Sequence, residues 1–123
     1  MRRILVEAPC RPTESASKVK MAILNIFPDA HLEEGGLISG RAQSLERFGE
    51  LLRNQRIRNS AREVLMGSIR GSRMVFHLNK QAAFVGKVSF SAHSPLGYIT
   101  VTIEAEDVEA VVEEVAPRIL GNP

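Results

Sequence analysis

Two segments of the chain alternate strictly between apolar and polar residues: RMVFHLN, residues 73–79, and GYITVTIEA, residues 97–105. The apolar positions are Met74, Phe76 and Leu78 in the first segment and Ile99, Val101 and Ile103 in the second. A period of two places these side chains on one face of a β-strand. Strands with one apolar and one polar face belong to a sheet that is covered on one side and is usually antiparallel. This pattern predicts such a sheet, with helices packed against its apolar face.

Three more segments are predicted to add strands to this sheet. They are RRILVEAP at residues 2–9, HLEEGGLISGRA at residues 31–42, and AFVGKVSFS at residues 83–91. The first alternates, with Ile4, Val6 and Ala8 on one side. The second contains a Gly-Gly pair, which indicates a small hairpin or a bulge. In the third, Phe84, Val88 and Phe90 are expected to face one way.

Apolar residues recur at helical spacing in four other segments. The stripes are Ala16, Val19, Ile23 and Ile26; Leu45, Phe48, Leu51 and Leu52; Ile57, Ala61, Val64, Leu65 and Ile69; and Val108, Val111, Val112 and Val115. Thr13 and Ser44 are candidate N-caps, and Pro28 ends the first helix. The phase slips at residues 56–59, which predicts two helices there. The order βαβ(β)ααβββα over residues 1–123 predicts one domain, an α+β two-layer sandwich with a largely antiparallel sheet and helices on one face.

Charge is segregated along the chain, although the net charge is only +2. Residues 41–97 carry ten basic and three acidic side chains, a net of +7, whereas residues 98–123 carry one basic and six acidic ones, a net of −5. LLRNQRIRNSAR, residues 51–62, holds four arginines and no acid. A concentration of arginine favours an anionic partner, because the guanidinium group can bond two phosphate oxygens at once.

The sequence carries no spacing that indicates a reaction. The histidines stand far apart without metal-ligand spacing, and GSIRGSR, residues 67–73, lacks the lysine of a phosphate-binding loop and reads better as a helix end with a turn. We therefore expect no catalytic residue, no metal and no cofactor. Cys10 is the only cysteine and is expected to be a packed residue. A chain that cannot form an internal disulfide is typical of a reducing compartment, and no segment is apolar enough to span a membrane. We therefore expect a cytoplasmic protein.

Three polar residues, Asn79, Lys80 and Gln81, separate two of the predicted strands. One interpretation is an exposed loop that donates hydrogen bonds to a phosphate, a base edge or a small ligand. The alternative is a short polar connection with a local helical turn. The sequence leaves both open.

Several stretches together resemble a small archaeal group, uncharacterised protein family 0201. They are RPTE, ILNIFPDA, SLERF, LLRNQRI, LNKQAAFVG and SPLGYITVTI, and the resemblance runs from Val6 to Pro117. Members of that family are similar in fold to the ribosomal large-subunit protein that binds the five S RNA. The resemblance therefore implies a two-layer α+β sandwich and favours an RNA-binding role, but it implies no reaction.

Three functions remain open for the arginines. The first is binding of structured RNA through its phosphate backbone, since aromatic residues for base stacking make up only 5% of the chain. The candidate contacts are Arg53, Arg56, Arg58, Arg62, Arg70, Arg73, Asn79, Lys80 and Gln81. The second is a structural role, in which the arginines pair with the acidic last helix of the same chain or of a homodimer partner. The third is a small-ligand site at residues 79–81.

Overall fold

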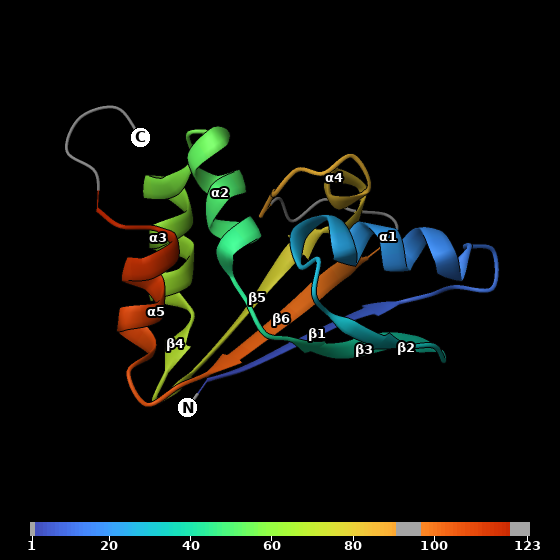
Figure 1. Ribbon diagram of the computed structural model, residues 1–123, viewed down its shortest axis with the longest axis horizontal. Helices are drawn as coiled ribbons and strands as arrows, with labels where there is room; N and C mark the ends of the chain where they lie inside the picture. The colour runs from blue at the N-terminus through green and yellow to red at the C-terminus, as the bar shows by residue number, and fades with distance from the viewer. Residues whose placement is uncertain (1, 91–96, 119–123) are drawn as a thin grey trace.

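Six strands form one sheet in the computed structural model, which describes residues 2–90 and 97–118 (Figure 1). They are β1 (Arg3–Pro9), β2 (His31–Glu33), β3 (Leu37–Ala42), β4 (Ile69–Arg70), β5 (Arg73–Asn79) and β6 (Tyr98–Glu104). The strand order is β2-β3-β1-β6-β5-β4, and every pairing is antiparallel. The predicted antiparallel sheet and the hairpin at residues 31–42 are thereby confirmed.

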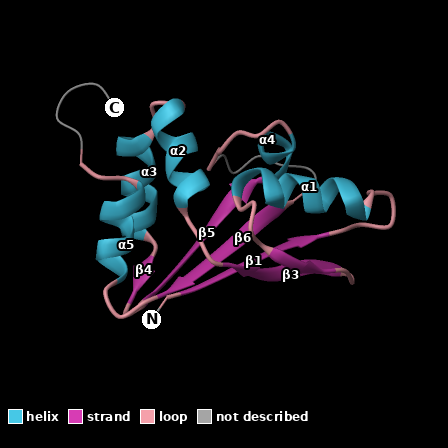
Figure 2. Ribbon diagram, in the orientation of Figure 1, coloured by secondary structure: helices cyan, strands magenta, loops and turns pink. Residues whose placement is uncertain are grey.

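The helices gather on one side of this sheet, as Figure 2 shows. They are α1 (Ala16–Ile26), α2 (Glu46–Asn54), α3 (Arg58–Gly67), α4 (Lys80–Phe84) and α5 (Val108–Val115). Alternate residues of β1, β5 and β6 are buried beneath them, while the residues between are mostly half-buried or exposed. The two-layer α+β fold is therefore as predicted. The predicted break between two helices also appears, at residues 55–57.

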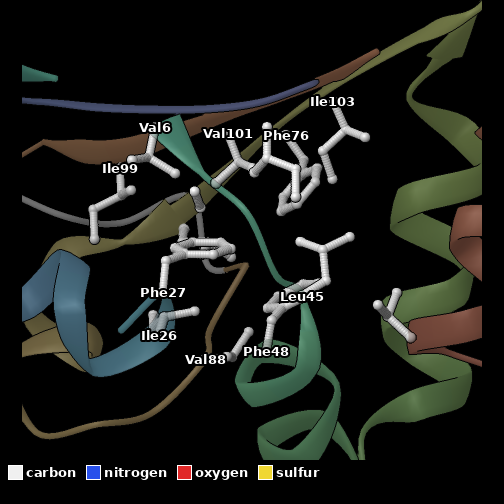
Figure 3. Close-up of a cluster of buried hydrophobic side chains, with 14 of the residues drawn as sticks. Val6, Ile26, Phe27, Leu45, Phe48, Phe76, Val88, Ile99, Val101 and Ile103 are labelled. Atoms are coloured by element: carbon white, nitrogen blue, oxygen red, sulfur yellow. The ribbon is translucent and has the colours of Figure 1, made fainter. Parts of the chain in front are cut away.

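The core lies between the two layers and is built around a row of phenylalanines (Figure 3). Phe48 on α2 stacks against Phe27 after α1 and against Phe76 on β5, with ring centroids 5.9 and 5.6 Å apart. Phe76 also meets Phe90 at 6.2 Å. Stacked aromatic pairs of this kind add to the stability that their buried area gives. The row packs α2 against β5, and α2 carries part of the arginine-rich segment.

The prediction of a strand at residues 83–91 is wrong for residues 83–90, while Ser91 lies outside the described residues. The Asn79 side chain accepts a hydrogen bond from the Ala82 N–H (3.0 Å), which caps α4, and Gly86 follows with φ +74°. A cap followed by two alanines favours a helical turn over the alternating pattern of the segment. Phe84 and Phe90 are still half-buried and Val88 is buried, so the apolar residues pack inward from a helical turn and a loop.

Three smaller expectations also fail. Ser15, not Thr13, caps α1, since its side chain accepts the Lys18 N–H at 3.4 Å. Val64 is 39% exposed, because its position on α3 is turned away from the sheet. Ile69 belongs to β4, where it pairs with Met74, and not to the helical stripe. The predicted helix end with a turn at residues 67–73 is confirmed, since α3 ends at Gly67 and the chain turns at Gly71, where φ is +66°. At α2 the N-cap position is Leu45, although Ser44 accepts the Glu46 N–H at 3.0 Å.

Candidate nucleic-acid interface

The arginines of the candidate set fall into two groups at opposite ends of α3. Arg53, Arg56 and Arg58 lie where α2 ends and α3 begins, whereas Arg70 and Arg73 lie on the β4–β5 hairpin that follows α3. With 10 residues, α3 separates the groups by about 15 Å, at 1.5 Å per residue. Figure 1 shows the turn between α2 and α3 near the top of the view and the β4–β5 hairpin near the bottom. The arginines therefore do not form a single patch.

Arg62, in the middle of α3, faces the acidic last helix. Its guanidinium group forms an ion pair with Glu113 on α5 and also donates to the Ala116 carbonyl oxygen at 3.2 Å. The hydrogen bond and the charge of Glu113 raise the pKa of Arg62, although partial burial opposes the shift. The same bond lowers the pKa of Glu113 despite the opposing effect of burial. At this position the structural interpretation of the arginines is correct.

The other arginines of residues 51–62 are not paired in this way. Within residues 2–90 and 97–118, no carboxylate lies within 4.0 Å of the guanidinium groups of Arg53, Arg56 and Arg58. Arg53 and Arg56 are exposed, whereas Arg58 is half-buried and its Nε has no hydrogen-bond partner there. Most of the arginine-rich segment is thus left without a carboxylate from the described chain.

Arg70 and Arg73, on the hairpin, differ from each other in their contacts. Arg70 folds back so that its Nη1 donates to the carbonyl oxygens of Gly67 (3.0 Å) and Ile69 (2.8 Å). Arg73 is exposed, and no carboxylate of the described chain approaches its guanidinium group within 4.0 Å. The neighbouring acid, Glu104, pairs instead with Arg3 at 3.1 Å. The hairpin therefore offers one unpaired arginine.

A groove of about 660 Å³ runs between α2 and the end of α5. Arg2, Arg53 and Arg58 line it together with Glu46, Glu50 and Glu114. Arg2 is already bonded to Glu114 at 2.8 Å, and Glu50 is bonded to Arg47 at 2.8 Å. Because the two signs of charge balance within it, this groove is a poor site for an anion.

The Asn79–Gln81 segment is not an exposed loop. It forms the cap and first turn of α4, as the helical-turn alternative predicted. Lys80 is fully buried, and its ammonium group donates to the Pro9 carbonyl oxygen (2.6 Å) and to both carboxylate oxygens of Glu14 (3.1 Å each). Asn79 is 7% exposed, and only Gln81 faces solvent. Lys80 is therefore not available to bind a small ligand, because its ammonium group already has three hydrogen-bond acceptors within the fold.

The Glu14 carboxyl has a lowered pKa for a combination of reasons. Burial alone raises its pKa, but this is outweighed by the Arg11 N–H bond (3.0 Å), by the hydrogen bonds from Lys80 and by the charges of Lys80 and Arg11. The charged form of the carboxylate is therefore favoured within the fold. The sequence did not predict this pair, because Glu14 and Lys80 lie 66 residues apart and no motif or spacing around either residue points to the other.

A second unforeseen contact involves Gln55, the residue between the two helices. Its Nε2 donates to the Val88 carbonyl oxygen and its Oε1 accepts the Val88 N–H, both at 2.8 Å. The side-chain amide thus pairs with a peptide group as a neighbouring strand would. The motif LLRNQRI placed Gln55 among the arginines, but nothing in the sequence pointed to Val88.

Two further features are absent from the described residues, a metal-binding cluster and a membrane-spanning helix. No three His, Cys, Asp or Glu side chains among them lie close enough together to hold a metal ion. None of the helices described is long and apolar enough to cross a membrane.

Comparison with known proteins reveals clear relatives. A family model described as RNA binding matches residues 3–105. A UPF0201 protein from Metallosphaera sedula is 43% identical, over 96% of this chain and 90% of the relative. UPF0201 protein MJ1564 from Methanocaldococcus jannaschii is 40% identical, over 97% of this chain and 75% of the relative.

Solved structures agree with these matches. The crystal structure of a UPF0201 protein from Methanococcus jannaschii covers 97% of this chain and 96% of its own, with a TM-score of 0.88 and 40% identity. A DUF54 protein from Archaeoglobus fulgidus, AF2318, shares the fold at a TM-score of 0.71 and 20% identity, over 95% of this chain and 97% of its own.

Proposed function

Because the chain belongs to the UPF0201 family of archaeal proteins, we propose that it is a non-catalytic module that binds structured RNA through the phosphate backbone. The observation that carries this proposal is the pair of exposed arginines at the end of α2, Arg53 and Arg56, which no carboxylate of the described chain approaches within 4.0 Å. The family model described as RNA binding, which spans residues 3–105, supports RNA as the anionic partner.

The chemistry of these side chains suits phosphate. A guanidinium group keeps its charge at all physiological pH values and presents a planar fork that matches two phosphate oxygens. Such contacts hold a nucleic acid in place without reading its sequence. They also release counterions, so that affinity falls steeply as the salt concentration rises.

The scarcity of aromatic residues argues for RNA with secondary structure. Tyr98 is the only tyrosine and is half-buried, with its ring 5.8 Å from that of His77 on the sheet. Four of the five phenylalanines form the row in the core. Single-stranded RNA is usually held by bases stacked on exposed aromatic rings. A protein without such rings is better suited to the regular backbone of a helical stem.

Filter binding of the full chain to an RNA hairpin tests the proposal at about 50 mM and about 200 mM salt. A DNA duplex of the stem sequence is the control for helix shape, since only the RNA stem has A-form geometry and 2′-hydroxyl groups. We expect binding to the hairpin at the lower salt concentration and a large loss at the higher one. Absence of hairpin binding at low salt, or affinity that does not change with salt, would contradict the proposal.

A further inference from the structure

The helix α2 ends with an arginine in a conformation that glycine usually adopts. The Ile57 N–H donates to the Leu52 carbonyl oxygen (3.0 Å), and the Arg56 N–H donates to the Arg53 carbonyl oxygen (3.1 Å). This bond pair defines a Schellman motif, in which the residue at the position of Arg56 is left-handed and most often glycine. Arg56 has φ +58°, and it is the only non-glycine residue with positive φ among those described.

An arginine at this position costs backbone energy that a glycine would avoid, because its Cβ crowds the neighbouring carbonyl group. The side chain offers no compensation within the described part of the chain. It is exposed, and no carboxylate there lies within 4.0 Å of its guanidinium group. Strained residues that the fold does not need are concentrated at functional sites. The backbone strain at Arg56 therefore indicates that its guanidinium group binds a partner outside the described fold.

The bidentate contact between Gln55 and Val88 brings a second segment to the end of α2. Figure 1 shows the segment after α4 running from α4 towards α2, and the bonds of Gln55 tie this segment to the residue that follows α2. The Val88 side chain is 3% exposed and lies in the core beside Phe48 (Figure 3), so the segment is anchored by its side chain as well as by its backbone. Lys87, the preceding residue, is exposed.

The Gln55–Val88 contact therefore joins two segments that carry exposed cations, Arg53 and Arg56 on one segment and Lys87 on the other. No carboxylate in the described chain lies within 4.0 Å of any of the three. Glu50, which precedes them on α2, is bonded to Arg47. A charged cluster on a well-anchored backbone binds phosphate at a low cost in conformational entropy.

We propose that Arg53, Arg56 and Lys87 form the primary contact for RNA phosphates, and that Gln55 is a positioning residue that keeps Lys87 beside the two arginines. The two arginines supply paired hydrogen bonds, and the lysine supplies a compact charge. This inference rests on the proposed function and selects one surface for it. The hairpin arginine Arg73, at the far end of α3, lies outside the contact.

The substitution Arg56→Gly separates binding from stability. Glycine relieves the left-handed strain, so the variant should unfold at the same temperature as the wild type or a higher one. RNA affinity at about 50 mM salt should nevertheless fall about tenfold, which is the loss expected when one hydrogen bond to a charged group is removed. The matched control is Arg73→Gln, which removes another exposed, unpaired arginine and should leave RNA affinity unchanged.

The outcomes distinguish this inference from the proposed function. If the wild type binds the hairpin and Arg73→Gln weakens binding while Arg56→Gly does not, RNA contacts the other end of α3 and the inference is wrong. If the wild type does not bind the hairpin at all, the proposed function itself fails.

A double-mutant cycle tests the role of Gln55. Lys87→Gln should weaken RNA binding in the wild-type background and have a smaller effect in the Gln55→Leu background, where the segment has lost its anchor at residue 55. A merely structural role for Gln55 would leave the effects of the two substitutions additive. Additive losses would therefore remove the positioning role, while the phosphate contacts of Arg53 and Arg56 would still be judged by the first test.

Discussion

The ammonium group of Lys80 lies 3.1 Å from both carboxylate oxygens of Glu14, and the pair is shielded from solvent by the fold. It ties the first turn of α4 to the segment between β1 and α1, with the Pro9 carbonyl oxygen as third acceptor. Removing one member leaves the other charge buried. We expect Lys80→Met to lower the free energy of unfolding by about 3–5 kcal/mol in urea denaturation.

The double variant Lys80→Met with Glu14→Leu is the control for this prediction. It replaces both charges by apolar groups, so much of the lost stability should return. A single substitution that costs less than about 1 kcal/mol would show that the pair is hydrated in solution.

Acid should destabilise the protein through Glu14 and Glu113. Both carboxyls have a lowered pKa in the folded state, so between that value and the unfolded value of about 4.3 the unfolded chain binds more protons. The stability from these groups is complete above about pH 4.3 and is lost as the pH falls through the folded values. Urea denaturation from about pH 7 to about pH 3 measures this.

Glu113→Gln serves as the comparison in the same titration, because Glu113 is exposed and Arg62 keeps its hydrogen bond to the Ala116 carbonyl oxygen in this variant. Its stability should depend less steeply on pH in the acid range than that of the wild type. Stability that stays constant or rises on acidification would contradict the lowered pKa values.

Arg62 should matter for the fold and not for RNA. Its guanidinium group already engages Glu113 and the Ala116 carbonyl oxygen, which joins α3 to α5. We expect Arg62→Gln to lower the melting temperature slightly and to leave the affinity for the RNA hairpin unchanged. A loss of affinity as large as that of Arg56→Gly would place Arg62 in the RNA contact after all.

Gly49 should accept a methyl group and nothing larger. A Cβ at this position of α2 would lie 3.6 Å from the Cα of Val115 on α5, an ordinary van der Waals distance. Gly49→Ala is expected to stabilise the fold by about 0.5–1 kcal/mol through its higher helix propensity. Gly49→Leu should destabilise it by pushing α2 away from α5. Thermal melts of both variants decide the matter, and a destabilised alanine variant would mean that the helices pack more closely in solution.

The sheet, the order of most elements and the core could be predicted because they follow from local periodicity. The alternation in β1, β5 and β6 appears as alternating burial, and the phase slip predicted at residues 56–59 corresponds to the break between α2 and α3 at residues 55–57. Residues 83–90 were mispredicted because Phe84, Val88 and Phe90 have a strand-like spacing. The capping bond of Asn79 and the positive φ of Gly86 favour a helical turn and a loop there.

The contacts that define the candidate site could not be predicted in this way, because they join distant parts of the chain. Gln55 meets Val88 across 33 residues, and Lys80 meets Glu14 across 66. Side chains of arginine look alike in a sequence whether they pair with an acid, as Arg62 does, or face solvent, as Arg56 does. Only the arrangement of α3 against α5 separates the two.

The salt dependence of hairpin binding is the most direct test of the central claim, measured for the wild type and for the triple variant Arg53→Gln, Arg56→Gln and Lys87→Gln. Each lost phosphate contact should reduce the slope of log affinity against log salt by about 0.7–0.9, so the triple variant should lose about 2–3 units of slope. An unchanged slope, with the variant folded and bound as tightly as the wild type, would contradict the account.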